Sequence, residues 1–176
     1  MALRLIDHWL ADGSEGLPPS PRAPVFDPNS GEVQAEVPLA GSEALERAVN
    51  AAAAAQPGWA ATNPQRRARV LFRFKELVEA EIDALARTLS AEHGKVVADA
   101  RGDIQRGLDV IEYACGIPHA LKGEYTQGAG PGIDVYSMRV PLGIGAGITP
   151  FNFPAMIPMW MFGVAIACGN AFILKP

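Results

Sequence analysis

The chain has 176 residues and is 49% hydrophobic, which is enough to bury a substantial core of its own. Its formal net charge of −4 excludes a basic footprint, so we expect no nucleic acid and no anionic membrane as a partner. The most apolar stretch, 155–168, is shorter than the roughly 20 residues that a membrane-spanning helix needs. The two cysteines, Cys115 and Cys168, have neither CxxC nor disulfide-framework spacing, which predicts a reduced, cytoplasmic setting.

The first 40 residues predict a peripheral arm. Strand-like pieces at 4–10 and 31–37 accompany turn signals at 12–13 and 27–28. Prolines between residues 18 and 24 exclude a helix in that part of the chain. A hairpin-like arm is the simplest interpretation of this pattern.

Three helices are predicted after the arm. The first, 42–56, begins with Ser42 as its N-cap and ends before Pro57. The second, 65–92, keeps apolar residues at helical spacing along its whole length. The third, 97–115, carries one apolar stripe that indicates packing on a single face.

Two short strands and then a βαβ unit are predicted after residue 123. Residues 123–140 read as two short strands around a glycine-rich turn at 128–132. A small-residue strand at 143–148, an apolar helix at 155–168 and a strand at 171–174 then form a βαβ unit. Such units build parallel sheets with helices on both faces, so we predict an α/β fold.

Three glycines in the strand at 143–148 suggest a dinucleotide-binding fingerprint at first sight. The G-x-G-x-x-G pattern needs its third glycine where Ile148 or Pro150 stands, so the pattern is not met. We interpret Gly143, Gly145 and Gly147 instead as small residues that allow close packing of the strand.

Asn152 is the most informative polar residue of the chain. It lies between Phe151 and Phe153, within a turn framed by Pro150 and Pro154. A rigid turn at the carboxyl end of a parallel strand would hold its amide as a fixed donor for an oxyanion. The alternative is that Asn152 caps the following helix, which is the commoner role of Asn at such a place.

Two cations have both a binding and a surface interpretation. Arg106 could bind a substrate carboxylate with its planar guanidinium, or it could pair with Asp103 or Asp109 on the helix surface. Lys175 could reach a nucleotide at the carboxyl edge of the sheet, or it could be a solvated loop residue.

The remaining reactive side chains do not predict a site. Cys115 and Cys168 lie in apolar helices with no His or Lys next to them, which is typical of buried, unreactive thiols. His8, His93 and His119 are isolated from one another, so no metal site is expected.

Two separated motifs, 148–160 and 169–176, resemble the aldehyde dehydrogenase superfamily and occur at that family's spacing. Most members have Trp where this chain has Phe151. That Phe, with Met-Ile-Pro-Met-Trp after it, is similar to the CoA-acylating methylmalonate-semialdehyde dehydrogenase branch. Short segments at 93–95, 101–103, 106–107 and 111–116 also resemble that branch, so the resemblance covers essentially the whole chain.

The resemblance implies a role for each candidate residue. Asn152 would donate its amide to the oxyanion of the thiohemiacetal and thioacyl intermediates. Thr149 and Phe151 would line the NAD site, and Lys175 would bind the adenine-side ribose hydroxyls. Arg106 would hold the carboxylate of malonate or methylmalonate semialdehyde.

The implied fold is the N-terminal part of an aldehyde-dehydrogenase-like fold, with helices followed by the first βαβ unit of a parallel NAD-binding sheet. Residues 1–122 would be the arm and helical part of the NAD-binding domain, 123–142 oligomerisation strands, and 143–176 the truncated first βαβ unit. The implied assembly is a homotetramer or homodimer.

The implied reaction is thiolate attack on the semialdehyde, hydride transfer to NAD, and acyl transfer to CoA with loss of CO₂. The product would be propionyl-CoA or acetyl-CoA, as in valine, pyrimidine or inositol catabolism. The family's catalytic cysteine and second carboxylate-binding Arg would lie beyond Pro176, so we expect this N-terminal portion to be inactive alone.

Three alternatives stay open at this point. The chain could be part of an ordinary NAD-dependent aldehyde dehydrogenase that does not use CoA. It could be a non-catalytic module that assembles with other subunits. It could also be a remnant that does not fold, because its parallel sheet lacks the later strands.

Overall fold

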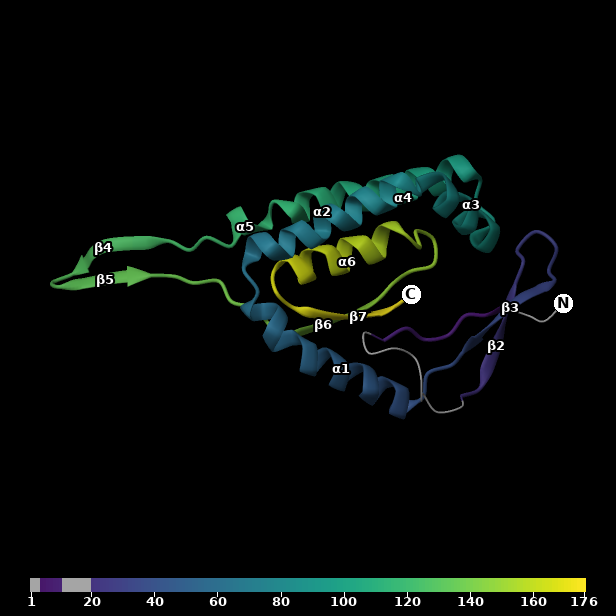
Figure 1. Ribbon diagram of the computed structural model, residues 1–176, viewed down its shortest axis with the longest axis horizontal. Coiled ribbons are helices and arrows are strands. Elements are labelled where there is room, and N and C mark those ends of the chain that lie inside the picture. Colours follow the sequence, from purple (N-terminus) through teal and green to yellow (C-terminus); the bar gives the residue numbers. More distant parts are fainter. Residues whose placement is uncertain (1–3, 11–19) are drawn as a thin grey trace.

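The computed structural model describes residues 4–10 and 20–176 (Figure 1). Its elements in chain order are β1 (Arg4–Leu5), β2 (Arg22–Phe26), β3 (Val33–Pro38), α1 (Ser42–Ala61), α2 (Pro64–Ala80), α3 (Ile82–His93), α4 (Val97–Cys115), α5 (Ile117–Ala120), β4 (Tyr125–Gly130), β5 (Ile133–Tyr136), β6 (Ile144–Ile148), α6 (Met156–Ala167) and β7 (Ala171–Lys175). No helix among these described elements is long and apolar enough to cross a membrane.

The body of the molecule is layered. Helix α6 lies between helices α2 and α4 on one side and the strands β6 and β7 on the other, and α1 covers the opposite face of those strands (Figure 1). Strands β6 and β7 pair in parallel, with Gly145 opposite Phe172 and Ile148 opposite Lys175. The predicted βαβ unit and the α/β fold class are therefore confirmed.

The glycines of β6 serve close packing. A Cβ atom at Gly147 would lie 2.6 Å from the sulfur of Met161 and 2.8 Å from the ring of Phe172. A Cβ at Gly145 would lie 3.1 Å from the same ring. Gly143 precedes the strand, with a φ of 121° that a larger residue would adopt only under strain. The packing interpretation fits Gly145 and Gly147 but is wrong for Gly143, where a Cβ would meet no atom within 4 Å and the positive φ is what favours glycine.

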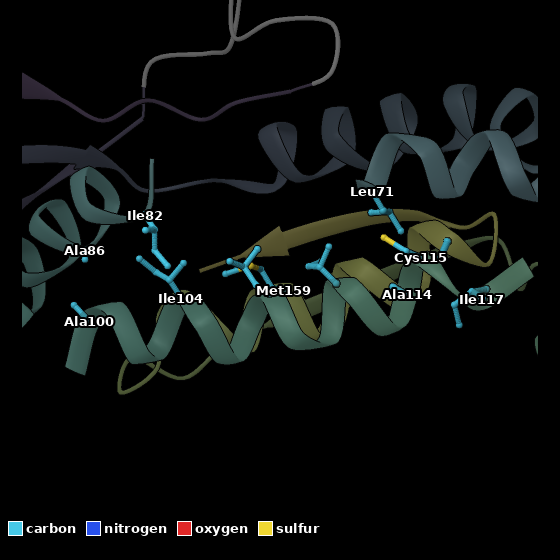
Figure 2. Close-up of a cluster of buried hydrophobic side chains, with 12 residues drawn as sticks. Leu71, Ile82, Ala86, Ala100, Ile104, Ala114, Cys115, Ile117 and Met159 are labelled. Carbon is cyan, nitrogen blue, oxygen red and sulfur yellow. The ribbon is translucent and has the colours of Figure 1, made fainter. Parts of the chain in front are cut away.

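The hydrophobic core lies where α4 meets α3, α2 and α6 (Figure 2). Leu108 and Ile111 of α4 are fully buried there. Gly163 of α6 allows close contact, because a Cβ at that position would come within 2.7 Å of Ile111. The buried set is Leu71, Ile82, Ala86, Ala100, Ile104, Leu108, Ile111, Ala114, Cys115, Ile117, Met159 and Ala167.

The first helix is longer than the sequence predicts. Helix α1 continues through Pro57 to Ala61, and its N-cap is Gly41 in place of Ser42. Proline removes one helical hydrogen bond, but the last turn is anchored from outside, because the indole nitrogen of Trp59 donates to the carbonyl of Ile166 at 2.9 Å. A hydrogen bond to a distant residue thus holds the last turn of α1, which follows Pro57.

The prediction of one continuous helix over 65–92 is wrong, because the structure has two helices there, α2 and α3. Glu81, with φ −108° and ψ 12°, leaves helical geometry between α2 and α3. After this break, α3 packs against α4, and its Ile82 and Ala86 join the core (Figure 2). Helix α4 agrees with the predicted 97–115 at both ends.

The arm is a three-stranded sheet in the order β1-β3-β2. Strand β2 was not predicted, and β1 is only two residues long where 4–10 was expected. The arm does contain an antiparallel hairpin, which β2 and β3 form across the predicted turn after Asp27. The two predicted strands, β1 and β3, pair in parallel instead. The turn predicted at 12–13 lies outside the described residues.

Candidate functional site

The ends of β6 and β7 bring two of the predicted residues together. The backbone N–H of Thr149 donates to the carbonyl oxygen of Lys175 at 3.1 Å. Both residues therefore lie at the carboxyl edge of the parallel pair, which is where α/β sheets bind nucleotides. The ammonium of Lys175 is exposed and donates to the carbonyl of Pro176 at 2.7 Å.

Asn152 does not cap helix α6. The helix begins at Met156 with Ala155 as its N-cap, and no side chain makes a cap hydrogen bond. The side chain of Asn152 is exposed and makes no hydrogen bond to any other residue that the structure describes. The capping alternative is therefore wrong, and the amide is available to a ligand.

A buried ion pair supports the turn that carries Asn152. The ammonium of Lys95 lies 3.2 Å from one oxygen of Asp103 and donates to the carbonyl oxygen of Asn152 at 3.0 Å. The other oxygen of Asp103 accepts from the N–H of Met156 at 2.7 Å. Asp103 is 0% exposed, and Lys95 also lies over the ring of Phe153 at 4.9 Å.

Sequence reasoning missed this ion pair, although the sequence contains a signal for it. Asp103 follows Ala100 by three residues and precedes Gly107 by four, so it falls on the buried stripe of α4. A carboxylate on such a stripe needs a partner, because an unpaired buried charge is very costly.

Arg106 and Asn152 line one open pocket of about 550 Å³, together with Lys95, Asp99 and Phe153. The pocket is formed by the start of α4 and by the turn between β6 and α6. Two small residues, Ala98 and Gly102, complete its wall. An aldehyde that also bears a carboxylate would find both a neutral donor and a cation there.

Arg106 is exposed on α4, as its surface alternative predicts, but the pairing with Asp103 or Asp109 that went with that alternative is wrong. Asp103 is bound to Lys95, and Asp109 accepts from the side chain of Gln105 at 3.1 Å. Within the described part of the chain, the guanidinium of Arg106 forms no ion pair. It therefore retains its full capacity for a carboxylate ligand.

Phe151 lies in the same turn but outside the pocket. Its side chain is 87% exposed and is not among the residues that line the pocket. The candidate residues thus form two groups, one at the strand ends and one at the pocket.

Neither cysteine is placed as a nucleophile. Burial raises the pKa of the Cys115 thiol, with Lys75 opposing it weakly. Burial also raises the pKa of Cys168, with Arg67 opposing. Neither thiol lines the pocket of Asn152. No three metal-binding side chains gather among the described residues.

The raised pKa values predict slow alkylation. Only the thiolate reacts, and a pKa above the usual value leaves less thiolate at neutral pH. Reactivity should appear only as the pH rises beyond about 8.5. With iodoacetamide at pH 7, we expect Cys115 and Cys168 to react at least about tenfold more slowly than glutathione. A mass-spectrometric time course measures this, and a rate equal to that of glutathione would contradict it.

Comparison with known proteins identifies the family. Residues 18–176 match the model of the aldehyde dehydrogenase family. The chain belongs to that family. This member is 50% identical over 169 residues to a malonate-semialdehyde dehydrogenase of Pseudomonas aeruginosa, covering 96% of this chain and 34% of the relative. It is also 50% identical over 152 residues to an acylating mitochondrial methylmalonate-semialdehyde dehydrogenase of Arabidopsis thaliana, covering 86% of this chain and 25% of the relative.

Solved structures of this aldehyde dehydrogenase family share the fold. A protein of Sinorhizobium meliloti 1021, described as a methylmalonate-semialdehyde dehydrogenase and solved with NAD, superposes with a TM-score of 0.96 at 56% identity. The match covers 99% of this chain and 36% of that protein. The predicted family and fold are therefore confirmed. The chain spans about a third of the length of the first of the curated relatives that it matches.

Proposed function

We propose that this chain supplies the oxyanion donor, part of the NAD site and part of the substrate site of a CoA-acylating malonate- or methylmalonate-semialdehyde dehydrogenase. The observation that carries the proposal is the shared pocket of Asn152 and Arg106. Names of the relatives supply the substrate class. In this proposal, residues 143–176 begin the NAD-binding sheet and residues 123–142 take part in assembly.

Asn152 stabilises negative charge on the substrate oxygen. When a thiolate adds to the aldehyde carbon, the carbonyl oxygen becomes an oxyanion, and the Asn152 N–H₂ group donates to it. A fixed donor is worth more in the charged transition state than in the neutral ground state, so it lowers the barrier. Because burial raises the pKa of both Cys115 and Cys168 and neither thiol lines the pocket, we assign the thiolate to the rest of a full-length enzyme.

The strand ends fit a nicotinamide dinucleotide. Thr149 and Lys175 lie side by side at the carboxyl edge, and the ammonium of Lys175 can donate to ribose hydroxyls. Phe151 offers an exposed ring beside them. When bound, NAD accepts the hydride of the thiohemiacetal, and the acyl group is then transferred to the thiol of CoA with loss of CO₂.

A fusion protein tests the proposal. In this fusion, the chain replaces the matching 36% of the Sinorhizobium meliloti protein. We expect continuous NADH formation from malonate semialdehyde and NAD only when CoA is present, and one NADH per active site without it. The 176-residue chain alone should form none. Rapid turnover without CoA would place the protein among ordinary aldehyde dehydrogenases.

Substitution of Arg106 tests the substrate class. In the fusion, Arg106→Leu should raise the KM for malonate semialdehyde by about 10- to 100-fold, because a charge-assisted hydrogen-bond pair is lost. The KM for propanal, which has no carboxylate, should stay unchanged. The matched control is Arg101→Leu, since Arg101 lies on the same helix and pairs with Asp83 outside the pocket. Equal effects on both aldehydes would remove the role of Arg106.

An assembly role is favoured by the β4–β5 hairpin, which extends away from the body (Figure 1). Its large apolar side chains, and those of the irregular segment that leads back to β6, are exposed: Tyr125, Ile133, Val135, Tyr136, Met138, Val140 and Leu142. Such an apolar surface is typical of a protein interface. We propose that it joins copies of the subunit, and a fusion that is monomeric by light scattering would contradict this.

A further inference from the structure

We propose that Lys95 and Asp103 are positioning residues, which hold the turn at 149–155 so that the amide of Asn152 stays directed at the reacting oxygen. This inference rests on the proposed role of Asn152. It assigns a function to a buried ion pair in which Asp103 lies outside the lining of the pocket, while Lys95 lines the pocket and also binds the turn.

Lys95 holds the backbone of Asn152 itself. Its ammonium crosses from the loop after α3 to donate to the carbonyl oxygen of Asn152 at 3.0 Å. Lys95 is in turn fixed, because the hydroxyl of Ser90 donates to its carbonyl oxygen at 2.7 Å. The Asn152 side chain makes no hydrogen bond to other described residues. Its direction therefore depends on how firmly its own backbone is held.

Asp103 holds the other end of the same segment. One carboxylate oxygen accepts from Lys95 at 3.2 Å, and the other accepts from the N–H of Met156 at 2.7 Å. That N–H belongs to the first turn of α6, which otherwise lacks a side-chain cap. Residues 152 and 156 are thus both tied to helix α4 through one carboxylate.

Stability alone does not account for this arrangement. A buried ion pair is often no more stable than apolar residues of the same volume, because desolvation offsets the attraction. Here the carboxylate is fully buried and the Lys95 side chain is 12% exposed. What apolar residues could not provide is a donor for the Asn152 carbonyl and an acceptor for the Met156 N–H. The pair therefore specifies the geometry of the turn.

The test measures kinetics in the fusion with the Sinorhizobium meliloti protein. Lys95→Met removes the donor, and the double variant Lys95→Met/Asp103→Asn also removes the carboxylate charge that would otherwise be left unpaired. We expect both to lower kcat by about 10- to 100-fold with KM nearly unchanged, because a misplaced catalytic group costs rate more than binding. Lys75→Met, which removes a lysine from an ion pair on α2, is the control and should keep the parental kcat.

A second set of variants separates positioning from stability. In an Asn152→Ala background, Lys95→Met/Asp103→Asn should cause no further loss of kcat, because no amide remains to be positioned. A further loss equal to that seen beside Asn152 would assign the effect to the fold and overturn the inference. A double variant with parental kcat would also overturn it. If Asn152→Ala itself kept the parental kcat, the oxyanion role would fail, and the inference would fail with it.

Discussion

Replacing Asn152 by Ala should lower the kcat of the fusion enzyme by about 100- to 1,000-fold, the usual cost of removing one oxyanion donor. The amide lines the pocket and is bound to no other described side chain, so its loss removes an interaction that strengthens in the transition state. The first-turnover rate of NADH formation without CoA measures this directly. KM should change little.

Two further variants sharpen that prediction. Asn152→Asp keeps the shape but places an acceptor where a donor is needed, so its loss of kcat should be at least as large. Asn29→Ala is the control, since Asn29 is exposed in the turn of the arm and should keep the parental rate. An Asn152→Ala variant within threefold of the parental rate would contradict the oxyanion role, on a scale where each tenfold is about 1.4 kcal/mol.

Replacing Asp103 by Leu should lower the free energy of unfolding of the chain by about 3–5 kcal/mol. The substitution leaves the ammonium of Lys95 without its buried partner and the N–H of Met156 without an acceptor. Urea denaturation followed by circular dichroism measures the change. The effect should exceed that of any exposed carboxylate on the same helix.

Asp109→Leu provides the matched control for Asp103. Asp109 is exposed on α4 and accepts from Gln105 on the same helix, so its replacement should change the free energy of unfolding by about 0.5 kcal/mol or less. Lys95→Met/Asp103→Leu should recover part of the loss, because no unpaired charge remains. If Asp103→Leu and Asp109→Leu cost the same, the buried pair does not support the turn.

Apolar periodicity predicted the elements whose packing is regular. Helix α4 was predicted to its last residue, because one stripe from Ala100 to Cys115 is buried along its whole length. The βαβ unit was predicted because β6, α6 and β7 are apolar and separated by clear turns. In both cases the local pattern and the tertiary burial agree.

The errors occurred where contacts from distant residues decided the outcome. Helix α1 passes through Pro57, and the anchoring carbonyl of Ile166 lies 107 residues from Trp59. Glu81 breaks a continuous apolar pattern so that α3 can pack on α4. Strand β2 contains Pro24 and exists because β3 pairs with it. None of these partners is visible in a local window of sequence.

The candidate site was predictable as a set of residues but not as a network. Asn152 was distinguished by its proline-framed turn, and Arg106 by its side-chain chemistry. The capping role of Asn152 is excluded because Ala155 is the N-cap of α6. The predicted pairing of Arg106 with Asp103 is excluded because Asp103 is bound to Lys95. That ion pair joins the start of α4 to a turn about fifty residues later. Hydrophobic periodicity relates only residues within one helix or strand, so it could not predict this contact.

In the proposed function, Asn152 binds the oxygen of the reacting acyl group. A crystal structure of the fusion enzyme, soaked with NAD and malonate semialdehyde in the absence of CoA, would hold the thioester intermediate and show that oxygen. We expect the side-chain nitrogen of Asn152 to lie about 2.7–3.1 Å from the thioester carbonyl oxygen. A thioester oxygen bound by another donor, with the Asn152 amide beyond hydrogen-bond distance, would contradict it.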